Sequence, residues 1–408
     1  MVKLPIYLDN HATTQADPQV VQAMIPYFTE HFGNAASRQH RFGWIAEEAV
    51  ENGRKTIARQ INAEAKEIIF TSGATESNNL ALKGMAEAYQ KKGNHLITSR
   101  TEHRSVLDVC SVLERTGYRV TYLNVDEYGT VNPQNVRDAM TDQTVLVSLM
   151  MANNEIGTLA PIKEIGQICL ERGILLHTDA TQSMGKTPID VKSLNIHCMS
   201  ISAHKIYGPK GIGALYVRNK NPRVRIVQQM DGGGHEGGMR SGTLNVPAIV
   251  GFAKAVELAA HQNAKESIRV AALRDRLEEQ LLAIDGARCN GHRTKRLYNN
   301  LNIIFPYVHA DDLMVALKDD VAVSSGSACS SAEFNAQKVS HVLSAIGLDD
   351  ELARCTIRIG LGRFTTEEEV DFAGRKIVEA VHRLRESSPQ FQMHAMAKSP
   401  EAITFPHL

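Results

Sequence analysis

The chain has 408 residues, of which 43% are hydrophobic and 22% charged, so it is long enough for two globular domains. Lysine and arginine total 45, as do aspartate and glutamate, which makes the formal net charge zero. A balanced charge gives no basis for capture of nucleic acid or of an anionic membrane. No apolar run approaches about 18 residues, and the first nine residues carry no targeting segment. We therefore expect a cytoplasmic protein, or a mitochondrial matrix protein in processed form.

Six cysteines, at positions 110, 169, 198, 289, 329 and 355, never occur as Cys-x-x-Cys. In so long a chain they do not resemble the disulfide framework of a secreted protein, and reduced thiols are expected. Cys110, Cys169 and Cys198 lie among apolar neighbours and are expected in the core. Cys329 differs, because it lies in a run of small residues, 324–331, that offers little bulk to bury it.

The first 220 residues predict strands that alternate with helices. Asp17-Pro18 marks the start of a helix, and a second helix is expected between about Ser37 and Asn62. Strands are expected at residues 67–71, 95–99, 120–125, 145–151, 174–177, 199–202 and 212–217. This alternation favours an α/β fold with a mainly parallel sheet between helices.

The last third of the chain predicts a smaller α+β domain. A long amphipathic helix from Asn245 to about Leu282 leads into it, and Thr365 with Glu368 forms a capping-box signature for a final helix to about Glu386. Shorter strands are expected at 301–305, 321–324 and 356–359, and shorter helices at 311–317 and 339–346. We predict a large domain of residues 16–260, a small domain of residues 1–15 with 261–388, and a polar, irregular and partly mobile tail, 389–408.

Polar side chains follow several predicted strands at the point where each strand ends. They are His103, Asn154, Asp179, Gln182 and Lys205. Because the carboxyl ends of parallel strands meet at one edge of a sheet, we expect these side chains to converge on one crevice. An arbitrary lysine is a solvated surface group, but one held at a strand end in apolar surroundings can form a Schiff base.

The converging groups match the parts of pyridoxal 5′-phosphate. Lys205 suits the aldehyde, and a carboxylate such as Asp179 keeps a pyridinium nitrogen protonated. The turn at 72–77 before a helix is an outline of a phosphate cradle, although it could be a plain helix cap. His103 suits the ring face and proton relay, or it is only a residue at a helix start. Their occurrence together predicts a pyridoxal-phosphate site.

Two other motifs do not support a different function. Gly185-Lys186-Thr187 resembles the end of a phosphate-binding P-loop, but no glycine occurs between Gly173 and Gly185, so the motif fails. The glycine-rich segment 231–238 contains His235 and Glu236, yet two potential ligands are poor evidence for a metal, and a mobile loop is favoured.

Across nearly its whole length the chain resembles a known family. The resemblance is carried by Thr71-Ser72-Gly73-Ala74-Thr75-Glu76-Ser77, Thr101-Glu102-His103, Asn153-Asn154-Glu155-Ile156-Gly157, Asp179-Ala180-Thr181-Gln182, Ser202-Ala203-His204-Lys205, Met239-Arg240-Ser241-Gly242-Thr243, Ser324-Ser325-Gly326-Ser327-Ala328-Cys329, Ile357-Arg358 and Leu361-Gly362-Arg363-Phe364-Thr365. These motifs resemble those of the cysteine desulfurases of the iron–sulfur cluster assembly type, in the class V aminotransferase group of fold type I pyridoxal-phosphate enzymes.

The resemblance implies a role for each matching residue. Lys205 would carry the cofactor covalently, His103 would stack on its ring, Asp179 would contact the pyridine nitrogen and Gln182 the ring hydroxyl. The remaining implied cofactor contacts are Ala74, Thr75, Asn154, Ser202, His204 and, from a second subunit, Thr243. Asn154 and Arg358 would bind the substrate carboxylate with Arg38 nearby. Cys329, on a mobile loop, would accept sulfur and could transiently ligate an iron–sulfur cluster shared with a scaffold protein.

The implied function is removal of sulfur from L-cysteine to give L-alanine and a persulfide on Cys329. The persulfide would supply iron–sulfur cluster assembly and other sulfur acceptors. The resemblance also implies a homodimer, a scaffold protein as partner, and no nucleic-acid or membrane partner. The rivals are a selenocysteine lyase or an aminotransferase of the same class, and a non-catalytic scaffold. An aminotransferase has no need of Cys329, and a scaffold would not be yellow when purified.

Overall fold

The computed structural model describes residues 2–325 and 339–398, and side chains as far as Met393. The chain divides into two compact units. The larger comprises 11–267 with 291–297, and the smaller comprises 1–10, 268–290 and 298–408. The larger unit thus begins five residues before the predicted domain of 16–260, and it takes in a short segment after the long helix. Cys329 lies outside the described residues.

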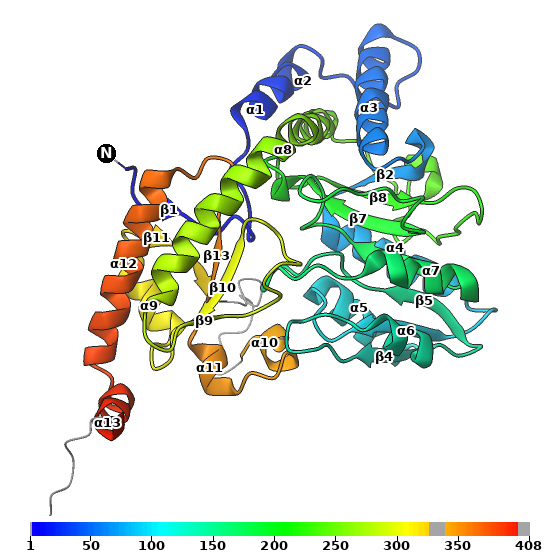
Figure 1. The fold of residues 1–408 in the computed structure, drawn as a ribbon. Helices are drawn as coiled ribbons and strands as arrows, with labels where there is room; N and C mark the ends of the chain where they lie inside the picture. The colour runs from blue at the N-terminus through cyan, green and yellow to red at the C-terminus, as the bar shows by residue number, and fades with distance from the viewer. Residues whose placement is uncertain (1, 326–338, 399–408) are drawn as a thin grey trace, which may run out of the picture. The chain divides into compact units, whose positions relative to one another are not determined.

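A seven-stranded sheet forms the centre of the larger unit (Figure 1). Its strands, in spatial order, are β2 (Ile68–Thr71), β8 (Gly213–Val217), β7 (Cys198–Ser202), β6 (Leu175–Asp179), β5 (Thr144–Ser148), β3 (His95–Ser99) and β4 (Arg119–Leu123). Strand β8 runs antiparallel to both neighbours, whereas the five strands from β7 to β4 are parallel. Every residue of β3, β5, β6 and β7 is buried, because helices cover both faces. The predicted mainly parallel sheet is confirmed.

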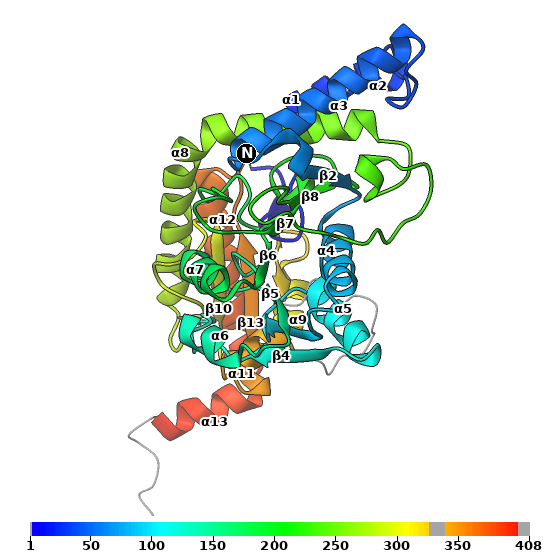
Figure 2. The ribbon, with the colours of Figure 1, turned by 90° about the vertical axis from the view of Figure 1, so that its right-hand side faces the viewer.

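Helices cover this sheet on both faces. Figure 2 shows α4 and α5 on one side, and α6 and α7 on the other. The bounds are α3 (Arg41–Gln60), α4 (Ala74–Ala88), α5 (Arg104–Arg115), α6 (Pro133–Ala139), α7 (Ile162–Arg172) and α8 (Val246–Leu282). One apolar core joins α3, α7 and the start of α8 to the sheet, and a second core joins α4 and α5 to it. Short 3-10 turns are η1 (Ala65–Glu67), η2 (Ala203–Lys205) and η3 (Glu236–Gly238).

The first helices of the larger unit are short and carry exposed apolar side chains. Helix α1 (Pro18–Met24) begins where predicted, since the Asp17 carboxylate caps it by accepting from Gln19 N at 2.9 Å. Helix α2 (Pro26–Thr29) follows at once and was not predicted. The exposed large apolar side chains between Val21 and Trp44 are Val21, Ile25, Phe28, Phe32, Phe42 and Trp44.

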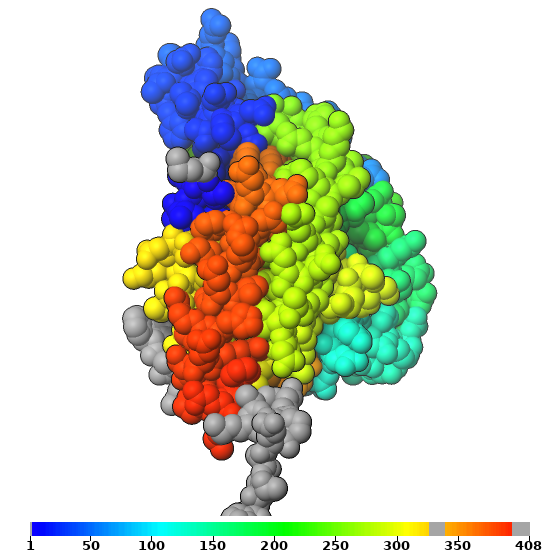
Figure 3. All heavy atoms as spheres, turned by 60° about the vertical axis from the view of Figure 1, so that its left-hand side comes forward, coloured from blue at the N-terminus to red at the C-terminus, as the bar shows by residue number. Residues whose placement is uncertain are grey.

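The smaller unit contains an antiparallel sheet in the order β12-β13-β10-β9 and a parallel pair β1-β11. Its strands are β1 (Ile6–Tyr7), β9 (Arg288–Cys289), β10 (Asn300–Ile304), β11 (Val321–Ala322), β12 (Ser324–Ser325) and β13 (Thr356–Gly360). Its helices are α9 (Ala310–Leu317), α10 (His341–Ala345), α11 (Asp350–Arg354), α12 (Glu367–Glu386) and α13 (Pro389–Lys398). Figure 3 shows α12 beside α8, and Arg276 of α8 pairs with Asp371 of α12 at 2.6 Å.

Two expectations for the end of the chain were wrong. The capping box lies one residue later than predicted, at Thr366 and Glu369, because the Thr365 hydroxyl instead accepts from Gly362 N at 3.0 Å. The tail of residues 389–408, expected to be irregular, begins with helix α13. Phe391 of that helix packs against the Tyr307 ring and beneath the Arg385 guanidinium. No helix among the described residues is both long and apolar enough to cross a membrane.

Candidate active site

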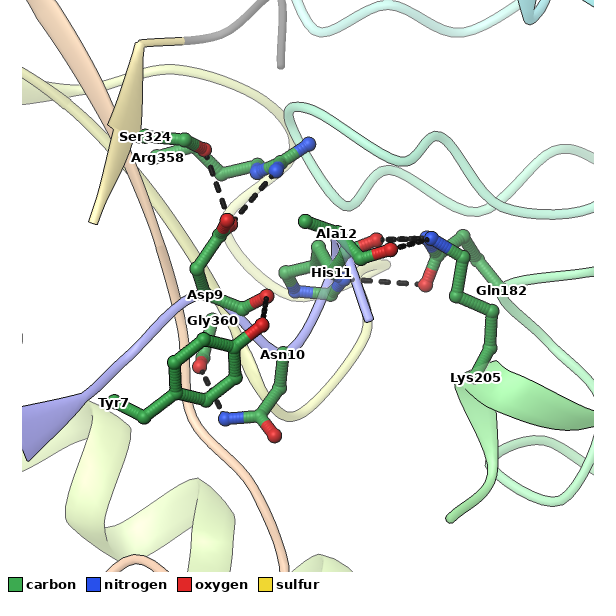
Figure 4. A network of polar contacts seen from close by, with 10 residues as sticks. All are labelled: Tyr7, Asp9, Asn10, His11, Ala12, Gln182, Lys205, Ser324, Arg358 and Gly360. Carbon is green, nitrogen blue, oxygen red and sulfur yellow. Dashed lines mark hydrogen bonds and ion pairs between the residues drawn. The ribbon is translucent and has the colours of Figure 1, made fainter. Parts of the chain in front are cut away.

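Lys205 lies at the end of strand β7, in the 3-10 turn η2 that follows it. Its side chain is buried, and Nζ donates to the backbone carbonyls of His11 and Ala12, each at 2.6 Å (Figure 4). Because β7 is buried on both faces, the turn at its end holds the Lys205 amine in the interior of the larger unit. Lys205 is therefore not a surface lysine.

A second buried amine, that of Lys186, lies close to Lys205. Lys186 Nζ donates to Gln182 O at 3.2 Å and to Gln182 Oε1 at 3.3 Å. Gln182 Nε2 in turn donates to the His11 carbonyl at 3.0 Å. Burial, aided by the charge of Lys205, lowers the pKa of Lys186 to about 7. The motif that failed as a P-loop therefore supplies a buried amine whose charge changes near neutral pH.

The surroundings of His204 are also cationic. Its Nδ1 lies 3.0 Å from Thr13 Oγ1. Burial lowers the pKa of His204 to about 3, and the neighbouring lysines, Lys205 first among them, act in the same direction. The positive charges of the neighbouring lysines, unlike the burial, make this region suited to an anion.

The predicted phosphate cradle is formed by the start of α4 and the end of β7. Gly73, at φ +154, precedes α4, and no side chain caps that helix start. A Cβ placed on Gly73 would lie 3.9 Å from Ser202 Oγ, so the two predicted halves of the cradle are adjacent. Ala74 and Thr75 are the first two residues of α4, where backbone N–H groups point along the helix axis. This arrangement fits a phosphate.

Asp179 ends β6, His103 follows β3, and the two residues are joined through two further side chains. Asp179 Oδ2 accepts from Asn78 Nδ2 at 2.8 Å, and Asp179 Oδ1 accepts from Thr181 N at 2.9 Å. His103 is the N-cap of α5, and its Nδ1 accepts from Ser105 N at 3.1 Å. His103 thus lies at a helix start, one of the two positions predicted for it from the sequence.

Two more polar residues, Asn154 and Glu102, follow strand ends of the sheet. Asn154 is partly buried and follows Asn153, whose Oδ1 accepts from the backbone N–H groups of Glu155 and Ile156 and so shapes the turn. Glu102 is fully buried and accepts from Met150 N at 2.8 Å. Burial first, and the charge of Asp179 second, hold the pKa of Glu102 well above its usual range.

Arg358 belongs to the smaller unit, in the middle of β13 between β10 and β12. It is 1% exposed, and its guanidinium pairs with Asp9 at 2.8 Å. The same Asp9 oxygen accepts from Ser324 Oγ at 3.1 Å. Figure 4 shows this group with Asn10, whose Nδ2 donates to Gly360 O at 2.9 Å.

The structure does not gather every predicted residue. Arg38 lies before α3 and lines a cavity together with Arg54, His235, Glu236 and other residues. Lys205 does not line this cavity. Glu236, considered as a metal ligand, instead pairs with the buried Arg54 at 2.7 Å. Thr243 is exposed and follows Gly242.

Another potential metal cluster occurs in the part of the chain that the structure describes. Ligand atoms of His309, Glu351 and Cys355 lie within 4.8 Å of one another. Burial, with the nearby carboxylate of Glu351, raises the pKa of Cys355 to about 11. Because a thiol binds metal as its thiolate, this cluster is a poor site at neutral pH.

Several residues of the site were not predicted from the sequence. Asn78 and Ser105 lie inside helices, and His11, Ala12 and Asp9 lie in an N-terminal segment for which no role was predicted. A signal was present, since the polar run 9–14 follows a short apolar stretch.

Comparison with known proteins agrees with this architecture. The profile of the family described as Aminotransferase class-V matches residues 6–372. A cysteine desulfurase IscS of Anaeromyxobacter sp. (strain Fw109-5) is 57% identical over 393 residues, with 96% of each chain covered. A cysteine desulfurase IscS of Pseudomonas aeruginosa (strain UCBPP-PA14) is 54% identical over 395 residues, again with 96% of each covered.

Solved structures with the same fold include a NifS-like protein, 36% identical, with a TM-score of 0.86 over 93% of this chain and 100% of that one. Another is SspA in complex with cysteine, 37% identical, with a TM-score of 0.77 over 88% of this chain and 100% of that one. The fold is the type I fold of pyridoxal-phosphate enzymes, as predicted. The chain belongs to the Aminotransferase class-V family, within its cysteine desulfurases of the IscS type.

Members of this family use pyridoxal phosphate, and the residues present fit that group. The uncapped start of α4 beside Ser202 suits the phosphate, and the buried amine of Lys205 suits the aldehyde. The Asp179 carboxylate, held by two donors, suits the pyridine nitrogen.

Proposed function

We propose that this chain removes the sulfur of L-cysteine, releases L-alanine, and holds the sulfur as a persulfide on Cys329. The observation that carries the proposal is the arrangement of Lys205, Asp179 and His103 at or just after the ends of parallel strands of one sheet, in a chain 57% identical to a named cysteine desulfurase. The comparison structure that holds cysteine supports the choice of substrate. The closing test of this proposal measures sulfur uptake directly.

The proposed roles use the groups already described. Pyridoxal phosphate, when bound at this site, would supply an electron sink for the negative charge that develops on the substrate α-carbon. Asp179 holds a proton at the ring nitrogen, Gln182 orients the ring hydroxyl, and His103 covers the ring face. The phosphate is held by Ala74, Thr75, Ser202 and His204, with Thr243 of a second copy. Lys205 Nζ, released from its covalent bond, moves the α-proton of the substrate.

The substrate carboxylate is proposed to bind Asn154 and Arg358, with Arg38 nearby. A guanidinium recognises a carboxylate through two parallel hydrogen bonds, which is why Arg358 is the stronger candidate for orientation. Arg358 already pairs with Asp9, so its side chain is fixed in direction before any substrate arrives.

In the proposed sulfur transfer, the Cys329 thiolate attacks the substrate sulfur. The bond between that sulfur and the substrate β-carbon breaks, its electron pair stays on the carbon, and the carbon takes up a proton. The products are alanine and the Cys329 persulfide, so atoms and electrons balance without an outside oxidant. We propose that the persulfide passes to an iron–sulfur scaffold protein and other acceptors, and that Cys329 can transiently ligate the growing cluster.

The test is incubation of the purified protein with ³⁵S-cysteine, followed by assay of alanine and of protein-bound label. The parent should form alanine and carry label that a thiol reductant removes. Cys329→Ser should lose both, while Cys289→Ser, a matched change at a half-buried cysteine, should keep both. Alanine formation by Cys329→Ser at the parent rate would overturn the assignment of Cys329. Lys205→Ala should purify without the visible absorbance of the lysine-bound cofactor.

A further inference from the structure

A chain of hydrogen bonds connects Asp179 to His103 inside the larger unit. Asn78 Nδ2 lies 2.8 Å from Asp179 Oδ2 and 2.8 Å from Ser105 Oγ. Ser105 Oγ lies 2.8 Å from His103 Nδ1, and the Ser105 backbone N–H donates to the same nitrogen at 3.1 Å. Asn78 and Ser105 are both buried, so water does not compete for these bonds.

The donors and acceptors in this chain can be assigned one by one. An ionised carboxylate only accepts, so the Asn78 atom that faces Asp179 is its NH₂ group. The second hydrogen of that NH₂ group points to Ser105 Oγ, which leaves the hydroxyl hydrogen of Ser105 for His103 Nδ1. The backbone N–H of Ser105 can only donate. His103 Nδ1 therefore receives two donors and carries no hydrogen itself.

This orientation of the Asn78 amide leaves its buried oxygen, Oδ1, without a hydrogen bond from the described residues. Turning the amide over would aim this oxygen at the Asp179 carboxylate, where two acceptors repel. The unpaired oxygen is thus the cost of directing both amide hydrogens toward Asp179 and Ser105.

We infer that Asn78 and Ser105 are positioning residues that hold His103 as the neutral tautomer with its hydrogen on Nε2, and that tie it to the Asp179 carboxylate. The inference rests on the proposed function for its catalytic meaning, since that function places His103 on the cofactor ring and Asp179 at the ring nitrogen. In this arrangement His103 offers a donor at Nε2. Taking up a proton at Nδ1 would set that hydrogen against the Ser105 backbone N–H and force the Ser105 hydroxyl to reverse from donor to acceptor, so the contacts favour the neutral form.

The test is ¹⁵N NMR of the cofactor-loaded protein with ring-labelled histidine, with the His103 signals identified by their loss in His103→Gln. The expected spectrum has Nδ1 in the unprotonated, hydrogen-bonded range and Nε2 in the protonated range. A hydrogen on Nδ1 would overturn the inference. Ser105→Ala should move the Nδ1 signal toward the range of a nitrogen with fewer donors. Ser111→Ala, at an exposed position of the same helix, should leave it in place.

Asn78→Asp provides a second, independent perturbation of the same hydrogen bond. A carboxylate at this position accepts the Ser105 hydroxyl hydrogen, so that hydrogen is withdrawn from His103 Nδ1. The Nδ1 signal should then move as in Ser105→Ala, and the doubly protonated fraction of His103 should rise. If Asn78→Asp does not fold, Ser105→Ala decides alone, and an unmoved Nδ1 signal there contradicts the inference.

Alanine formation from cysteine is measured on the same samples. Absence of alanine from the parent, with the expected spectrum, would remove the proposed function and leave the tautomer assignment standing. Normal alanine formation together with a hydrogen on Nδ1 would remove the tautomer assignment and leave the proposed function standing.

Discussion

At the scale of single residues, the Asp9 carboxylate holds two polar side chains of the smaller unit. It accepts from the Arg358 guanidinium and the Ser324 hydroxyl, and Arg358 is almost fully buried. A buried guanidinium needs a counter-charge, because water no longer solvates it. The proposed role of Arg358 in binding substrate therefore depends on a residue that binds no substrate itself.

Asp9→Ala should destabilise the smaller unit by about 3 kcal/mol, since it leaves the Arg358 charge buried without its carboxylate partner. The free energy of unfolding from urea denaturation measures this loss. Asp371→Ala removes the carboxylate of an exposed ion pair in the same unit and should change stability little. Equal losses in the two variants would contradict the argument.

Glu102→Gln should change the pH dependence of stability. The pKa of Glu102 is raised by burial, so the folded state keeps a proton that the unfolded state releases above about pH 4.3. Folding stability from this group is thus lost as pH rises above that value, toward the raised pKa. The glutamine keeps an oxygen to accept from Met150 N but does not titrate. Thermal midpoints between pH 5 and 8 should rise in the variant relative to the parent, most at the upper end.

The candidate site could be predicted in part from sequence. Lys205, Asp179 and His103 each follow an apolar run, so strand ends alone placed them at one sheet edge. Asn78 could not be found in this way, because its partner Asp179 lies 101 residues further along the chain and nothing local marks the pair. Asp9 is 349 residues from Arg358, and the pairing depends on a two-residue strand.

At the scale of elements, the parallel strands accommodate polar side chains inside an otherwise apolar core. His177 of β6 lies between Ser148 Oγ, at 2.8 Å from Nδ1, and Ser200 Oγ, at 3.0 Å from Nε2. Continuous apolar runs made these strands predictable to within a few residues, apart from β5, which ends three residues earlier than expected. The short elements α2 and α13 were missed because their few residues have no clear apolar period, and tertiary contacts such as those of Phe391 decide their structure.

His177→Gln should flatten the acid dependence of stability. Burial lowers the pKa of His177 to about 4, whereas in the unfolded chain it is about 6.5. Between these values the unfolded state binds a proton that the native state does not, so stability falls as pH drops. The full effect is about 3 kcal/mol at pH 4. The variant should be less stable than the parent at pH 7, with a smaller further loss in thermal midpoint between pH 6.5 and 5. An unchanged slope of the thermal midpoint against pH would show that His177 does not determine the acid dependence of stability.

At the scale of the whole molecule, the exposed apolar side chains between Val21 and Trp44 are difficult to reconcile with a single copy in water. Phe32 is 62% exposed and Trp44 55%, and the Phe32 and Phe42 rings lie with centroids 5.2 Å apart. Patches of this kind mark interaction surfaces. They support the proposed homodimer, as does the exposed position of Thr243, which is available to a second copy.

Phe32→Asp should shift the protein from dimer toward monomer, because it places a charge among these aromatic side chains. Light scattering after size-exclusion chromatography measures the mass. Val315→Asp, at a 70% exposed residue of the smaller unit, is the matched control and should remain a dimer. A monomeric parent would contradict the proposal of a dimer. A dimeric Phe32→Asp variant would show that the interface does not involve these aromatic side chains.

The smaller unit is built from both ends of the chain, and this orders its folding. Asn10 bonds to Gly360, 350 residues away, and Ile6 pairs with Val321 in strand β11. The larger unit is nearly continuous from 11 to 267, so most of its contacts can form before the last third of the chain is synthesised. The first ten residues can make their contacts only after the last third of the chain has been synthesised. Assembly of the smaller unit, including the Asp9–Arg358 pair, is therefore expected to be the late step during synthesis, and chains truncated before β13 should keep the large sheet while lacking that pair.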